Sequence, residues 1–259
     1  YFTQCLTMRR ELGLRHAVGA SLNNIGVIAS SLGKFQEAIR YHDDSRKIKT
    51  DVGDHFGVGN SLQNIGIAYM NLGEYETAKR YFERALVIAQ TMKHRVGEAD
   101  MHNALGLILR RLGGNLQTAR EHLEKAIMLA TEIDDKLGIA LAQSNLGDVL
   151  IGLGELESAR VTLHQALMNA QAINAMQPLL RTLMWFGKLQ ALAGNYTTAT
   201  LLWSFVNLHD SCDIETRNDS ERLLADIADK LSAETLASAV RDSEKHTLQT
   251  MVTLIQGEG

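Results

Sequence analysis

The chain has 259 residues, enough for one large domain or two small ones, and carries a formal net charge of −4. Hydrophobic residues make up 45% and charged residues 22%, proportions that exclude a disordered chain. A single proline and 5% aromatic residues argue against an all-β sandwich, and no apolar run is long enough to cross a membrane. No run of Lys or Arg is present, so nucleic acid is not expected to bind directly.

The two cysteines, Cys5 and Cys212, lie near opposite ends of the chain. They form neither a disulfide framework nor a zinc pattern, and they predict a reducing, cytoplasmic environment. The sequence begins at Tyr1 without an initiator Met or a signal peptide, so we expect it to be a piece of something longer.

Residues 1–16 predict a single helix. Phe2, Cys5 and Leu6 have the spacing of Phe82 and the Ala85-Leu86 pair, which we place in the second helix of a later hairpin. The chain is therefore expected to open inside the second helix of a truncated repeat.

Residues 17–210 predict five repeats of about 40 residues, because one motif recurs in register. Its copies are Asn24-Ile25-Gly26, Asn64-Ile65-Gly66, Ala104-Leu105-Gly106, Asn145-Leu146-Gly147 and Trp185-Phe186-Gly187. Seven residues after each motif glycine comes another glycine, a residue often found just past the end of a helix. Apolar residues at helical spacing on both sides of it predict two helices, as in residues 62–72 and 74–86. Each repeat is then a helical hairpin that buries its apolar face only by stacking on its neighbours.

The first full repeat departs from this pattern. His42, Ser45 and Arg46 stand where the second helix should carry a large apolar residue, an alanine and a leucine. One interpretation is a locally weaker junction packed by Tyr41 and Ile48. The other is a flexible point or a polar contact for a neighbouring domain.

Residues 211–259 lose the repeat and predict a helical C-terminal cap. A polar connector is expected over residues 210–220, followed by helices near 220–231, 233–242 and 245–255. Such a cap covers the last apolar face of a stack of repeats.

The pattern from Asn64 through Gly66, Tyr69, Gly73, Ala78 and Phe82 to Leu86 resembles the tetratricopeptide repeat, in a variant with a 40-residue period. That variant is found in kinesin light chain, Pins-type adaptors and bacterial regulators. The resemblance implies an all-α, right-handed solenoid of about five hairpins plus the cap. The tail from Glu221 to Ile255 resembles the end of bacterial STAND-type ATPases and LuxR-like or AfsR-like regulators.

No catalytic, metal or cofactor site is predicted. The sequence has no phosphate-binding loop, nucleophile elbow or His-Glu-x-x-His motif. The nine histidines are scattered, and His102, His122 and His164 are interpreted as ordinary surface or groove residues.

The resemblance places ligands on the concave face lined by the first helices. There the chain offers amides, apolar residues and charges that suit an extended peptide. The predicted binding residues are Asn23, Asn24, Gln63, Asn64, Ile67, Met70, Asn71, Asn103, Leu107, Arg110, Arg111, Asn145, Asp148 and Lys188.

Structural alternatives remain open for several of these residues. Asn24, Asn64 and Asn145 suit bonds between neighbouring helices as well as bonds to a ligand. Arg110 and Arg111 suit a carboxylate or simply the end of a helix. Trp185 suits an aromatic anchor or a site covered by the tail, whereas Trp203 is predicted to be core.

The function predicted is a non-enzymatic interaction or sensing module at the end of a larger cytosolic regulator. Its expected partner is a protein or peptide, and the parent protein's own switch domain is one candidate. The alternatives are a stand-alone adaptor joining two proteins, and a small-molecule sensor or oligomerisation scaffold. The sequence does not fix the oligomeric state.

Overall fold

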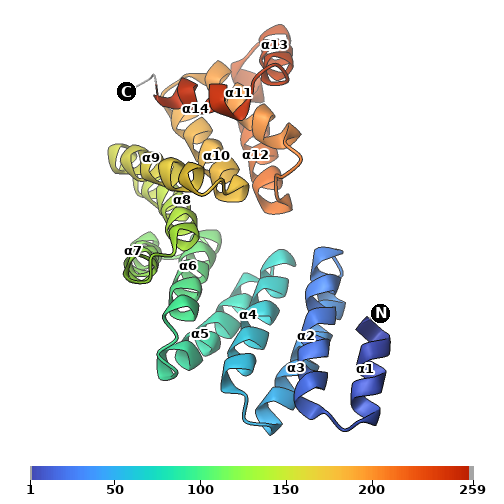
Figure 1. Ribbon diagram of the computed structural model, residues 1–259. Coiled ribbons are helices and arrows are strands. Elements are labelled where there is room, and N and C mark those ends of the chain that lie inside the picture. Colours follow the sequence, from blue (N-terminus) through green and yellow to red (C-terminus); the bar gives the residue numbers. More distant parts are fainter. Residues whose placement is uncertain (1, 257–259) are drawn as a thin grey trace. The chain divides into compact units, whose positions relative to one another are not determined.

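The computed structural model describes residues 2–256, and every element in that part of the chain is helical (Figure 1). The chain divides into two compact units, Tyr1–Ile133 and Asp134–Gly259, which are described separately below. The all-α architecture and the series of helical hairpins expected from the sequence are confirmed.

The first unit contains one single helix and three hairpins. Its helices are α1 (Phe2–Glu11), α2 (Arg15–Ser31), α3 (Phe35–Asp51), α4 (His55–Asn71), α5 (Tyr75–Thr91), α6 (Arg95–Arg111) and α7 (Leu116–Glu132). The hairpins are α2–α3, α4–α5 and α6–α7, and they stack through α3 on α4 and α5 on α6. Leu6 of α1 is buried against α2, whereas Tyr1 and the side chains of Phe2 and Cys5 lie outside the described residues.

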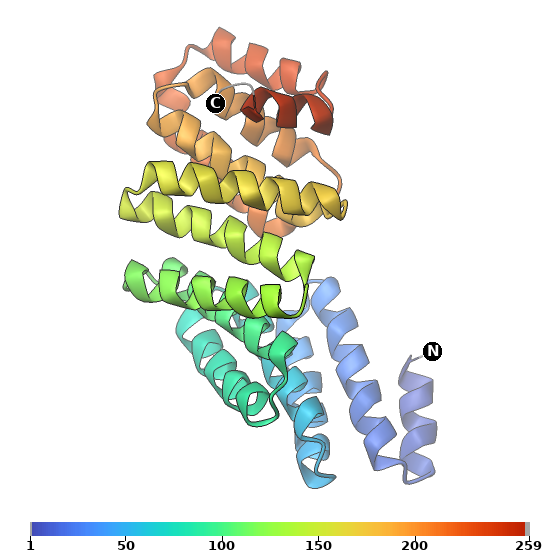
Figure 2. The same ribbon diagram turned by 60° about the vertical axis from the view of Figure 1, so that its left-hand side comes forward.

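The second unit contains two hairpins and the cap. Its helices are α8 (Lys136–Leu153), α9 (Leu156–Ala172), α10 (Met176–Leu192), α11 (Tyr196–Leu208), α12 (Ile214–Asp226), the short 3-10 helix η1 (Ala228–Lys230), α13 (Ala233–Ser243) and α14 (Leu248–Gln256). Helices α8, α9 and α10 lie side by side (Figure 2), and α12 and α13 pack on α11.

The expected connector over residues 210–220 is wrong in its length, because α12 already begins at Ile214. Asp213 precedes this helix, and its carboxylate accepts a hydrogen bond from the backbone N–H of Thr216 at 2.8 Å. The sequence therefore suggested a loop at Asp213, whereas this residue caps the start of α12.

The turns follow the glycine pattern of the sequence. Gly73 ends α4 with φ at +76°, and the four corresponding glycines also have positive φ. The turn between successive hairpins also needs a left-handed residue. Glycine supplies it at Gly13 and Gly53, but Lys93 takes this position with φ at +55°.

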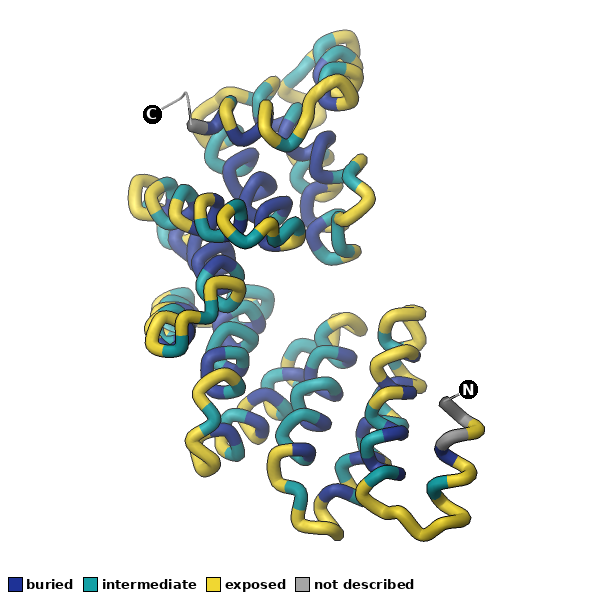
Figure 3. The backbone as a smooth tube through the Cα atoms, in the orientation of Figure 1, coloured by how far each residue is buried: buried dark blue, intermediate teal, exposed yellow. Residues whose placement is uncertain are grey.

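The core of each hairpin forms where the motif glycine meets the second helix. A Cβ atom on Gly66 would lie 2.6 Å from the ring of Phe82, so only glycine permits this approach. Phe82 fills this space and also packs with Met101, Leu105 and Ile108 of α6. Buried residues accordingly recur along the helices of both units (Figure 3).

Candidate functional site

The predicted binding residues of the first unit lie on its first helices, α2, α4 and α6. We call the side of the unit that they form the α2/α4/α6 face. The half-buried members are Asn23, Gln63, Asn64, Ile67, Met70, Asn103, Leu107, Arg110 and Arg111. Asn24 and Asn71 are exposed.

Two of the predicted amides bond to each other across neighbouring helices. The Nδ2 of Asn64 on α4 donates to the Oδ1 of Asn23 on α2 at 3.2 Å. The imidazole of His42 on α3 lies 3.2 Å from the same oxygen. A carboxamide oxygen only accepts, so His42 donates through its Nδ1–H. Asn64 thus bonds the neighbouring first helix through Asn23.

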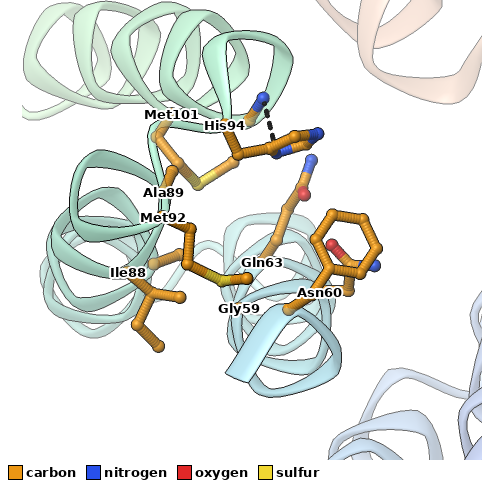
Figure 4. A pocket seen from close by; sticks show the side chains of 11 residues that line it. Gly59, Asn60, Gln63, Ile88, Ala89, Met92, His94 and Met101 are labelled. Carbon is orange, nitrogen blue, oxygen red and sulfur yellow. Dashed lines mark hydrogen bonds between the residues drawn. The ribbon is translucent and has the colours of Figure 1, made fainter. Parts of the chain in front are cut away.

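An open pocket lies between α4, the end of α5 and the start of α6, and Figure 4 shows the side chains around it. Ala85, Ile88 and Ala89 of α5 and Met101 of α6 supply apolar surface. Phe56, Asn60 and Gln63 of α4 line the other side. The enclosed part of the pocket is small, about 20 Å³, and the rest is open to solvent.

Two exposed apolar side chains stand at this pocket. Phe56 is 46% exposed and Met92 is 44% exposed, although both are large hydrophobic residues. The ring of Phe56 meets the ring of His94 edge-on, with 5.0 Å between their centroids. His94 is in turn held by the first turn of α6, because its Nδ1 accepts the backbone N–H of Gly97 at 3.2 Å. The pocket wall is therefore fixed from both α4 and α6.

Other predicted residues of this face have partners within their own unit. Asn71 donates to the backbone oxygen of Ile67 at 2.9 Å, one turn back in α4. Ile67 and Met70 pack against the core around Phe82. Arg110 and Arg111 occupy the last turn of α6, where a cation is stabilised by the helix dipole.

In the second unit the predicted residues are paired across first helices. Asp148 of α8 is buried, and Lys188 of α10 donates to it at 3.3 Å. Arg181 of α10 lies 3.4 Å from the Oδ1 of Asn145, so the amide of Asn145 also bonds a neighbouring helix.

The two tryptophans of this unit are both buried. Trp185 is 5% exposed, with the ammonium of Lys188 5.2 Å from its ring centre. Trp203 is core, as predicted, and its Nε1–H donates to the backbone oxygen of Met184 at 2.8 Å.

One contact was not predicted. His102 of α6 and His122 of α7 approach to 2.9 Å between their Nδ1 atoms. One Nδ1–H donates to the other Nδ1, so the two rings carry their protons on different nitrogens. Burial, together with the charge of His122, lowers the pKa of His102 to about 4. Among the described residues, no group of three or more His, Cys, Asp and Glu side chains could hold a metal ion.

The stacked hairpins and their paired first helices define an α-helical repeat protein. The family model described as "Tetratricopeptide repeat" matches residues 17–91 and 97–172, more than half of the chain. The chain belongs to the tetratricopeptide repeat family, whose members are generally non-enzymatic interaction modules. No curated protein matches this chain.

Solved structures share the fold at low sequence identity. BtubC from P. vanneervenii has a TM-score of 0.65 at 16% identity, covering 86% of this chain and 89% of its own. A Rap protein complexed with competence and sporulation factor has a TM-score of 0.66 at 15% identity, with coverages of 95% and 77%. Aspartyl phosphate phosphatase F from Bacillus subtilis has a TM-score of 0.67 at 12% identity, with coverages of 90% and 61%.

No helix in the described part of the chain has the length and apolar character needed to span a membrane.

Proposed function

We propose that the first unit binds an extended peptide segment of a protein partner on its α2/α4/α6 face. The observation that carries this proposal is the open apolar pocket between α4, α5 and α6. Phe56 and Met92 remain exposed beside it, and large apolar side chains in such a place gain free energy when a partner covers them.

The size of the pocket favours a side chain over a cofactor. Its enclosed volume of about 20 Å³ is far below that of small-molecule sites. One aliphatic side chain of a peptide can lie over this shallow pocket against Phe56 and Met92, and the surrounding surface then meets the peptide backbone.

Amide side chains around the pocket suit a peptide backbone. Asn60 and Gln63 line its α4 side, and Asn103 follows on α6. A carboxamide donates and accepts at once, so it pairs with both groups of a peptide unit. In this mode the backbone contacts fix the register while the buried side chain supplies affinity.

The same proposal places this module in a larger regulator. The cap resembles the ends of STAND-type and LuxR-like proteins, so the bound peptide could come from the parent's own switch domain. A phosphate-binding loop encoded upstream would support that context. An adaptor of the kinesin-light-chain type, or a small-molecule sensor or scaffold, are the alternatives.

A displayed peptide library tests the binding site. The full 259-residue chain is used for selection, and affinities of the enriched peptides are measured by fluorescence anisotropy. Gln63→Trp places a bulky ring at the pocket and should weaken the selected peptides at least about tenfold, through lost anchor burial. Gln90→Trp on exposed α5 surface outside the pocket is the matched control and should leave affinity within twofold. Equal affinity for both variants would refute the pocket as the anchor site.

A further inference from the structure

The first hairpin carries an imidazole at a position where the other four carry a large apolar side chain. The motif glycines Gly66, Gly106, Gly147 and Gly187 are met by Phe82, Leu123, Leu163 and Trp203. In the first hairpin, a Cβ on Gly26 would lie 2.6 Å from Cε1 of His42. His42 is only 1% exposed, so it fills the same space as Phe82 does in the second hairpin.

The polar replacement continues along α3. Ser45 and Lys49 are buried at the positions held by Ala85 and Ala89 in α5. Ser45 donates to the backbone oxygen of Gly19 at 2.7 Å, and Lys49 donates to that of Gly57 at 3.2 Å. These bonds satisfy the buried side chains of Ser45 and Lys49, and neither bond reaches the amides of the α2/α4/α6 face.

The contact of His42 is different, because it reaches the face. Its Nδ1–H and the Nδ2 of Asn64 both donate to the Oδ1 of Asn23, each at 3.2 Å. The carboxamide of Asn23 is therefore held with its oxygen toward α3 and α4. Phenylalanine or leucine at this position has no group that could hold it so.

We propose that His42 is a positioning residue for the peptide-binding face. It fixes the Asn23–Asn64 amide pair so that the NH₂ of Asn23 and the carbonyl of Asn64 are presented to the backbone of the bound peptide. This inference rests on the proposed function, and it makes the first hairpin part of the binding face together with the pocket at α4 and α6.

Packing and hydrogen bonding at this position can be separated. Burial, and to a smaller extent the charge of Lys49, lowers the pKa of His42 to about 4, so the ring is neutral at pH 7. Burying a polar ring costs more free energy than burying an apolar ring of similar size, unless the hydrogen bond that the polar ring makes offsets the difference. His42→Phe keeps the packing seen at Phe82 and removes only the donor.

The test uses peptides selected on the wild-type chain. His42→Phe should melt at the same or a higher temperature, yet bind these peptides about three- to tenfold more weakly, as expected for loss of a hydrogen bond that orients the site. In ¹H–¹⁵N spectra, the side-chain NH₂ signals of Asn23 and Asn64 should shift. His42→Gln, which retains a donor, should recover part of the affinity.

Two controls keep the outcome decisive. Leu163→Met changes the same position in the α8–α9 hairpin of the second unit, away from the pocket and the Asn23–Asn64 pair, so affinity should stay within twofold. If His42→Phe fails to fold, His42→Leu replaces it, since leucine occupies this place at Leu123 and Leu163. Unchanged affinity in a folded His42→Phe or His42→Leu chain overturns the inference. Full affinity in Gln63→Trp instead overturns the proposed binding site.

Discussion

Gly66 of α4 and Phe82 of α5 touch across the second hairpin, and a Cβ atom on Gly66 would lie 2.6 Å from the phenyl ring. Phe82 is fully buried and also packs against Met101 and Ile108 of the following hairpin. The missing side chain of one residue thus lets a single ring join two hairpins. The glycine is required here by close approach, whereas Gly73 is required by its φ of +76° in open space.

Gly66→Ala should therefore cost more stability than Gly73→Ala. The buried ring of Phe82 cannot move without disturbing α6, and such overpacking costs about 1–3 kcal/mol or more. Gly73→Ala should cost about 1–2 kcal/mol, the typical cost of a left-handed conformation for a residue with a Cβ atom, because there is open space around it. The free energies of unfolding, measured by chemical denaturation, check this order. A smaller loss for Gly66→Ala than for Gly73→Ala would contradict it.

The hairpins could be predicted from the sequence because their causes are local and repeated. Gly73 and its counterparts mark helix ends, and apolar residues at helical spacing mark the faces. The cap was less predictable. Asp213 begins α12 as a helix cap, but an isolated polar residue gives the same signal in a loop.

The site was predicted only in part, because its pocket depends on side chains from three helices. Gln63 was among the predicted binding residues, but Ile88 and Met92 come from the second helix of the hairpin and were not expected at the face. The sequence did offer one sign of the pocket. Phe56 is a phenylalanine at a repeat position where the other repeats carry His16, Val96, Leu137 and Gln177. The His102–His122 contact joins residues twenty positions apart and has no local signature.

The first unit should lose stability as the pH falls from about 6.5 to about 4. Burial lowers the pKa of His42 and of His102 to about 4, so both rings fold in the neutral form. Between the folded and unfolded pKa values the unfolded chain binds more protons, and stability therefore rises with pH in this window. For His42 the loss on acidification is up to about 3 kcal/mol, from about 1.4 kcal/mol for each unit of pKa shift.

The His42→Phe chain provides the comparison for this pH dependence. Carboxyl groups titrate in both chains, so their contribution cancels in the difference between the two free energies of unfolding. That difference should grow as the pH drops from 6.5 to 4 and stay constant above pH 7.5. Parallel curves across the whole range would show that protonation of His42 does not oppose folding.

Removal of Arg181 should loosen α12. This guanidinium on α10 is only 15% exposed and lies 3.0 Å from Glu215 and 3.3 Å from the hydroxyl of Thr216, both on α12. Hydrogen bonds to charged groups are worth about 1.5–3 kcal/mol, so Arg181→Leu should raise amide exchange in residues 214–226. Helix α9 should exchange as before, because the bonds of Arg181 go to α8 and to the start of α12.

Arg222 offers a matched control within the same helix. It is 62% exposed and bonds Asp219 one turn away at 2.9 Å, so it does not connect α12 to another element. Exposed pairs of this kind contribute about 0–1 kcal/mol. Arg222→Leu should leave the exchange of α12 almost unchanged, and equal effects of the two substitutions would argue against Arg181 as the link.

Lys93 should be replaceable with a gain in stability. It lies in the turn between the second and third hairpins with φ at +55°, and the equivalent residue is Gly53 one repeat earlier and Asn174 two repeats later. A left-handed conformation costs an ordinary residue about 1–2 kcal/mol, and asparagine relieves part of that cost through its local hydrogen bonds. Lys93→Asn should therefore raise the free energy of unfolding by about 0.5–1 kcal/mol, and Asn174→Lys should lower it by a similar amount.

Urea titrations check both changes, and the two substitutions should shift the midpoint in opposite directions with unchanged slopes. Shifts in the same direction would show that the backbone of these turns does not limit stability.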